Sequence, residues 1–256
     1  MSFTTTGGGA WEVWDRFICI DGKPAFHIGN VCGTCEFFFR HVAQSDLASI
    51  ELDELRSGLA EGYLTFNQIC GKFSDVFPAG DYYAVLFEFR PKLAGHLGAP
   101  DYFDMELREA WRGVEDEEQG SPLWPYYRTE PWTIGDGARC FEFIVPLYSP
   151  SNTDPQRVDE YQKPYGEHLS PIAVALGVLD VKSSEAWPED ESGEKIQPEF
   201  RTHWCLANYL LDGHHKVLGA ARSGQALRMI SFISRDHSWK QVDDLLAGYL
   251  TKETTP

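Results

Sequence analysis

The residues best suited to chemistry lie together in one short stretch, Asp212-Gly213-His214-His215-Lys216. Two imidazoles and an ammonium group can orient a phosphate or a carboxylate. Imidazole also titrates near neutral pH, so we assign Asp212, His214 and His215 as candidate catalytic residues for proton transfer. A glycine in the turn lets a ligand approach the backbone where a Cβ would block it. Gly213, His215 and Lys216 are therefore the candidate phosphate-binding residues.

The surrounding pattern predicts the elements that position this turn. Residues 204–209 are apolar and short enough for a buried strand, and the apolar residues within 217–221 recur at helical spacing. Gly224 stands where such a helix would end, and residues 227–233 have the composition of another strand. The predicted unit is a strand, a sharp turn, a short helix and a second strand.

The predicted helix start is a natural site for an anion, because its first N–H groups are unpaired and the helix dipole is positive there. Asp212 is placed to cap this helix. The same placement should lower the pKa values of His214 and His215 and favour their neutral forms. The alternative is a capped surface helix with two incidental histidines. The consecutive His-His-Lys run on an acidic chain favours the anion site.

Cys32 and Cys35, in the sequence CGTC, form a second motif with three open interpretations. They could form a redox pair at a helix start, where the dipole lowers the thiol pKa. They could supply half of a zinc site, with further ligands brought in by the fold. They could also be two small buried cysteines at a tight turn. Because residues 25–30 are not the long apolar strand typical of thioredoxin-like sites, we assign Cys32 and Cys35 as candidate zinc ligands.

The stretch LLDGHHKVLGAA, residues 210–221, resembles the DGHHR-plus-alanines signature of the ParB/sulfiredoxin-like superfamily. Members of that superfamily bind nucleotide phosphates with the turn and helix start that correspond here to residues 213–216. Residues 143–147 and the following Asp-Pro-Gln-Arg segment, 154–157, resemble the family's entry strand and its Pro-Gln-Arg segment. Residues 170–174 resemble its proline-isoleucine strand. The resemblance covers residues 140–237 and adds Arg157 as a second phosphate contact.

Two departures narrow what the resemblance implies. Sulfiredoxins carry a catalytic cysteine where this chain has His214, so their chemistry is not implied. Chromosome-partitioning members carry an arginine-rich box, of which Lys216 alone keeps a cation. Free-serine kinases and related enzymes share a DGHHR-type turn. The resemblance therefore implies a nucleotide- or phosphate-binding enzyme, an ATP- or ADP-dependent phosphotransferase that acts on a small molecule. The expected cofactors are a nucleotide (ATP, ADP or CTP) and Mg²⁺. The alternative is a non-catalytic ligand- or protein-binding module with a structural zinc or redox CxxC site.

The whole pattern predicts an α+β (mixed α/β) chain, with a ParB/sulfiredoxin-like C-terminal domain packed on a mixed-sheet N-terminal domain. We place the boundaries at 1–10 for a disordered leader, 11–138 for the CxxC-bearing N-terminal domain, 139–240 for the second domain, and 241–256 for a terminal helix and tail.

Within these limits the pattern predicts a hairpin at 11–30 around an Asp-Gly turn, helices at 34–43 and 45–62, strands at 81–90, 140–147 and 171–181, and an exposed acidic loop at 183–198. The run 171–181 is apolar throughout, as expected of a strand buried on both faces. The aromatic stretch 123–132 is either a stacking surface for a base or a hydrophobic cluster beneath a loop.

Composition excludes several classes of function. With 39 acidic and 22 basic residues, a net charge of −17 argues against a nucleic-acid partner, which draws on lysine and arginine. No apolar run is long enough to span a membrane, and the N-terminus lacks the features of a signal peptide. Six irregularly spaced cysteines do not suggest a disulfide scaffold. These features predict a cytoplasmic protein, and its oligomeric state is not indicated.

Overall fold

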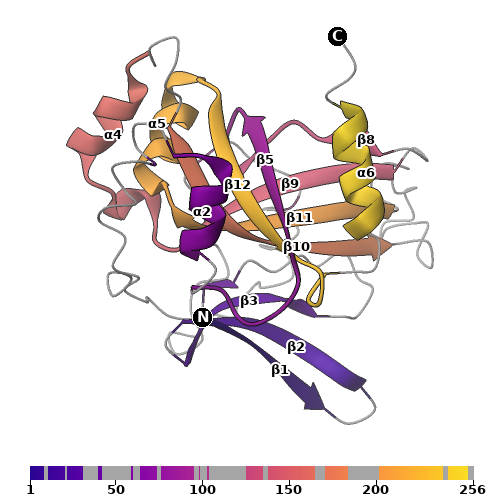
Figure 1. Cartoon of the computed structure of the whole chain (residues 1–256). Coiled ribbons are helices and arrows are strands. Elements are labelled where there is room, and N and C mark those ends of the chain that lie inside the picture. Colours follow the sequence, from indigo (N-terminus) through magenta and orange to yellow (C-terminus); the bar gives the residue numbers. More distant parts are fainter. Residues whose placement is uncertain are drawn as a thin grey trace, which may run out of the picture.

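The computed structural model describes residues 1–8, 11–20, 22–30, 40–41, 59, 64–73, 76–94, 98, 103, 125–134, 138–164, 171–183, 202–238 and 242–252. The chain is α+β, as predicted, with a small sheet and a larger mixed sheet (Figure 1). The predicted helices at 34–43 and 45–62 and the acidic loop at 183–198 lie almost entirely outside the described residues.

The small sheet is formed by four antiparallel strands in the order β1-β2-β3-β4. Their bounds are β1 (Ser2–Gly8), β2 (Trp11–Ile20), β3 (Lys23–Asn30) and β4 (Arg40–His41). The predicted hairpin is confirmed, and Gly22 in its turn has a φ of 76°, which favours glycine. The disordered leader expected at residues 1–10 is wrong for Ser2–Gly8, because this threonine-rich segment pairs with β2.

The larger sheet has eight strands in the order β5-β12-β10-β11-β9-β7-β6, with β8 also paired to β9. The bounds are β5 (Tyr82–Phe89), β6 (Lys92–Ala94), β7 (Tyr126–Arg128), β8 (Trp132–Ile134), β9 (Ala138–Pro146), β10 (Ile172–Ser183), β11 (Thr202–Asp212) and β12 (Leu227–Ser234). The strands predicted at 81–90, 140–147, 171–181 and 227–233 are confirmed. β10 is central and buried on both faces, as its sequence indicated.

Two helical connections link strands that are not neighbours in the sheet. The chain passes from β9 through the short 3₁₀ turn η3 (Pro150–Asn152) and helix α4 (Pro155–Gln162) to β10, on the far side of β11. It then passes from β11 through α5 (His214–Ser223) to β12, on the far side of β10. β9 and β11 are parallel, so both end at the same edge of the sheet. That edge is where α5 begins.

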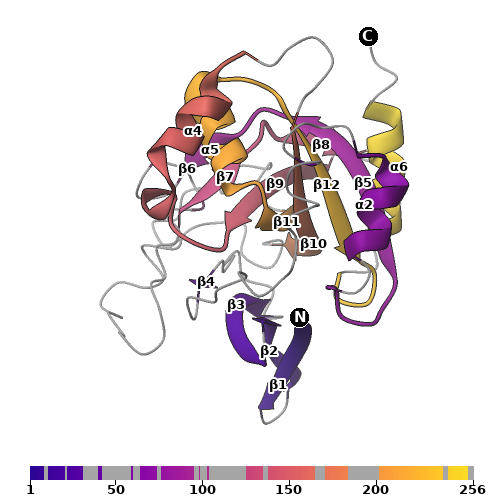
Figure 2. The same cartoon turned by 60° about the vertical axis from the view of Figure 1, so that its left-hand side comes forward.

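The two faces of the larger sheet are covered differently (Figures 1 and 2). The small sheet and α2 (Phe66–Phe73) pack on one face, where Phe26 of β3 contacts Tyr209 of β11 at 4.9 Å between ring centroids. On the other face α4 and α5 cover one end, and the terminal helix α6 (Val242–Lys252) covers the other. The terminal helix predicted within 241–256 is confirmed.

The boundary predicted between residues 138 and 139 runs through the larger sheet, since β5, β7 and β8 pair with strands that follow it and β6 pairs with β7. The described part of the aromatic stretch 123–132 contributes to the core of this sheet. Tyr126 and Tyr127 are buried on opposite faces, in contact with the two main hydrophobic clusters. This placement supports the hydrophobic-cluster interpretation of the stretch over a base-stacking surface.

Candidate functional site

The start of α5 depends on Gly213, which is the residue that precedes the first helical turn. Gly213 has a φ of 103°, in the left-handed region that favours glycine. A Cβ there would lie 2.9 Å from the Cβ of Ala173 on β10, so the turn also needs glycine to approach that strand. The helix has no side-chain cap. Asp212 was predicted as that cap, and this prediction is wrong.

Asp212 instead binds the ammonium group of Lys216. Oδ2 of Asp212 lies 2.6 Å from Nζ of Lys216, and Nζ also donates to the carbonyl of Ile172 at 2.9 Å. The lysine side chain is 6% exposed, so it directs its charge at its own chain rather than at solvent. Lys216 thereby ties α5 to the end of β11 and the start of β10.

His214 is buried and accepts a hydrogen bond from the backbone. Its Nε2 receives the N–H of Leu147 at 3.0 Å, and its ring stacks on Tyr148 at 4.0 Å between centroids. Burial lowers the pKa of His214 to about 3, so the ring is neutral. A neutral imidazole whose Nε2 accepts carries its proton on Nδ1. The lowered pKa was predicted, although burial is its main cause.

His215 makes the equivalent contact with the start of α4. Its Nε2 accepts the N–H of Asp154 at 3.1 Å, and the ring is partly exposed. Burial, and then the nearby Arg157 guanidinium, lower its pKa. The neutral ring therefore also carries its proton on Nδ1 and presents an N–H donor. In both histidines the lone pair of Nε2, which a general base would use, is occupied.

Arg157 comes to the start of α5 from helix α4. Asp154 caps that helix by accepting the N–H of Gln156 at 2.9 Å, and Pro155 occupies its first turn. Arg157 is exposed, hydrogen-bonds the hydroxyl of Tyr161, and acts on the pKa of His215. The structure thus brings together Arg157 and residues 212–216, which are far apart in sequence.

Sequence reasoning missed three contributors: Tyr148, Tyr161 and the amide of Leu147. The amide follows β9, and its place beside His214 depends on β9 lying parallel to β11, which local sequence does not decide. The two tyrosines carry no local signal for these contacts.

Cys32 and Cys35 lie outside the described residues, so the predicted zinc site stays a prediction. Among the residues that the structure does describe, no group of three or more histidine, cysteine, aspartate or glutamate side chains could hold a metal ion. In the same part of the chain no helix is long and apolar enough to cross a membrane.

Comparison of the chain with family models, with curated proteins and with solved structures found no match.

Proposed function

We propose that the chain binds a phosphate-bearing small molecule, a nucleotide, at the start of α5 and transfers a phosphoryl group from it. The observation that carries the proposal is an uncapped helix start beside His215 and Arg157 on a chain of net charge −17. Helix N–H groups and the helix dipole favour an anion, and a guanidinium binds phosphate oxygens in pairs. Local cations of this kind can hold an anion against the overall charge.

The contacts described above divide the roles within this proposed site. His215 donates through Nδ1 to a phosphate oxygen, beside the N–H groups of the first turn of α5. Arg157 supplies the exposed cation. His214 and Lys216 position the turn, because their polar atoms bind Leu147, Ile172 and Asp212. Asp212 is then the candidate proton acceptor, since a carboxylate accepts hydrogen bonds and both histidines present donors.

A Mg²⁺ ion would accompany a nucleoside triphosphate and neutralise developing charge on its phosphates. The carboxylates of Asp154 and Asp212 both act on the pKa of His215 and are therefore the nearest candidates to meet such an ion. Magnesium is held by few protein ligands together with phosphate and water, which fits a site with two carboxylates.

A second candidate function is binding without turnover. It is favoured by the same histidine contacts, because two occupied Nε2 atoms leave Asp212 as the one proton acceptor within the described 212–216 turn. The chain would then act as a ligand- or protein-binding module, with Cys32 and Cys35 as a separate zinc or redox site.

Thermal-shift titration of the full chain tests the binding proposal. ATP, ADP, CTP, GTP and inorganic phosphate are compared, each with and without Mg²⁺. A ligand at about 100 times its dissociation constant stabilises the fold by about 2.7 kcal/mol. Arg157→Met is expected to weaken binding about tenfold or more, since charge-assisted hydrogen bonds contribute about 1.5–3 kcal/mol.

Lys163→Met is the matched control, because Lys163 is an exposed cation at the opposite end of α4. No stabilisation of the well-folded wild type by any of these ligands would refute the proposed site. Formation of ADP from ATP with a panel of hydroxyl-bearing acceptors then separates the two candidate functions. Turnover that Asp212→Asn abolishes while binding persists supports the phosphotransferase.

A further inference from the structure

In the part of the chain that the structure describes, strand β5 forms one edge of the larger sheet and lacks several of the features that usually protect an edge strand. Among the described residues it pairs on one side only, with β12 (Figure 1). Its eight residues, YYAVLFEF, keep a continuous register with β12 and contain no bulge, proline or lysine. Natural sheets use those features to prevent pairing with another chain. A regular apolar edge without them is a template for a further strand.

The middle of β5 also carries an exposed leucine. Leu86 is 40% exposed, and within the described part of the chain it and Phe66 are the two exposed large hydrophobic side chains. Phe66 lies on helix α2, whereas Leu86 lies on the strand edge itself. An added strand would cover Leu86.

We propose that β5 pairs antiparallel with β5 of a second copy of this chain, around a two-fold axis that passes through Leu86 normal to the sheet. This joins the two large sheets into one continuous sheet. The axis sets Leu86 opposite Leu86, Val85 opposite Phe87, Ala84 opposite Glu88, and Tyr83 opposite Phe89.

The self-pairing register is what selects a second copy as the partner. It covers Leu86 with its own equivalent and places aliphatic and aromatic side chains opposite each other, as stable cross-strand pairs require. Glu88, the one charged residue of β5, meets Ala84 and no carboxylate. Two-fold pairing is also the commonest symmetry of protein assemblies. Because two chains of net charge −17 repel at long range, salt should strengthen this dimer.

Sedimentation of the full chain over a series of protein and salt concentrations tests the dimer. The wild type is expected to reach twice the single-chain mass, and Leu86→Lys to remain a single chain because it places two ammonium groups on the axis. Phe66→Lys, at the other exposed hydrophobic residue, should dimerise like the wild type. A wild type that stays monomeric throughout, or a dimer that Leu86→Lys leaves intact, overturns the proposal.

Oxidative cross-linking checks the register without relying on a disrupted strand. Leu86→Cys should form a covalent dimer, because opposed Cα atoms lie about 4.5–5.5 Å apart, within reach of a disulfide. Ala84→Cys, on the same face, should not, because its two copies lie roughly 13 Å apart along the strands. Wild type under the same oxidant gives the background from its six cysteines. Equal cross-linking of Ala84→Cys and Leu86→Cys would refute this register.

Discussion

Each polar side chain at the start of α5 binds a different segment of the chain. His214 accepts from Leu147 after β9, His215 accepts from Asp154 before α4, and Lys216 donates to Ile172 at the start of β10. Residues whose types suggest catalysis thus hold three chain segments around one helix start. What the turn presents to a ligand is N–H donors, which is the chemistry of anion binding.

Replacing His214 by glutamine is expected to make the free energy of unfolding depend less on pH in the acid range. Burial lowers the pKa of His214 from 6.5 to about 3, so below pH 6.5 the unfolded chain takes up a proton that the folded chain excludes. The stability that neutral His214 contributes is complete above pH 6.5 and is lost progressively as the pH falls toward 3. In that window the wild type should lose up to about 1.4 kcal/mol per pH unit relative to the variant.

Urea unfolding of wild type and His214→Gln at several pH values within this window measures the difference. Glutamine can still accept the N–H of Leu147 through its side-chain oxygen, but it does not titrate. The remaining titratable groups are common to both proteins, so their contributions cancel. If the free energy of unfolding falls equally with pH in both proteins, the lowered pKa of His214 is contradicted.

At the scale of elements, local pattern predicted β5, β10 and the unit β11-α5-β12. The strands are short apolar or aromatic runs, the helix has apolar residues at helical spacing, and turn residues lie between them. The role of Asp212 was not predictable in this way. An aspartate before a helix and four residues before a lysine fits a cap and an ion pair equally well, and the burial of Lys216 decides between them. Strand β1 was missed because its sequence, SFTTTGG, is polar and lacks apolar alternation, although it pairs with the adjacent β2.

The contacts of the candidate site were predictable only in part. The pairing of His214 with Leu147 depends on β9 and β11 being parallel neighbours, which strand order decides and local sequence does not. Arg157 was placed near the site by resemblance, and its contact with Tyr161 then follows from one turn of helix α4.

Gly219 lets helices α4 and α5 approach closely, so Gly219→Ala should destabilise the fold. An added Cβ would lie 2.6 Å from the Cβ of Tyr161 and 2.9 Å from its carbonyl carbon, so α4 would have to move. The expected cost is about 1–3 kcal/mol, as for other overpacked sites. Gly71→Ala on α2 is the control, because no atom of the described residues lies within 4 Å of the position that its Cβ would take. That substitution should stabilise the helix by about 0.5–1 kcal/mol. The denaturant midpoints of both variants, compared with that of the wild type, measure these effects. A Gly219→Ala midpoint equal to that of the wild type would show that α4 moves without loss of stability.

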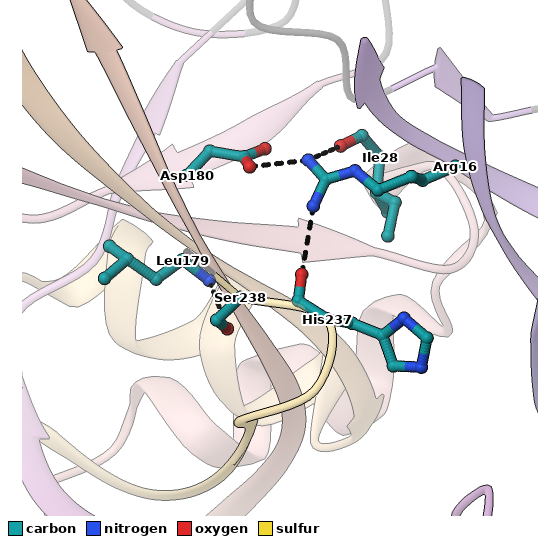
Figure 3. A network of polar contacts seen from close by, with 6 residues as sticks. All are labelled: Arg16, Ile28, Leu179, Asp180, His237 and Ser238. Atoms are coloured by element: carbon teal, nitrogen blue, oxygen red, sulfur yellow. Dashed lines mark hydrogen bonds and ion pairs between the residues drawn. The ribbon is translucent and has the colours of Figure 1, made fainter. Parts of the chain in front are cut away.

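At the scale of the whole molecule, polar contacts fix how the small sheet sits on the larger one. Arg16 of β2 donates to Asp180 of β10 at 2.5 Å and to the carbonyl of His237 at 2.9 Å (Figure 3). The ring of His237 stacks on Phe3 of β1 at 3.7 Å between centroids. Hydrophobic packing between the sheets has no direction of its own, so these contacts supply the orientation.

Asp180→Asn should therefore loosen the small sheet more than the larger one. The Arg16 and Asp180 side chains are 12% and 4% exposed, so the substitution leaves a buried guanidinium without its counter-charge. Such a loss costs about 3–5 kcal/mol. Urea unfolding should give the cost, and hydrogen exchange should show faster opening of amides in β1 to β3 than in β10 and β11.

Lys92→Ala is the matched control for this change, since it removes an ion pair with Glu130 whose side chains are 67% and 76% exposed. Exposed pairs contribute at most about 1 kcal/mol, because water and salt screen them. If Asp180→Asn costs no more than Lys92→Ala, the orientation of the two sheets rests on apolar packing alone. If it costs several times more and the added exchange is confined to β1 to β3, the buried pair fixes the small sheet against the larger one.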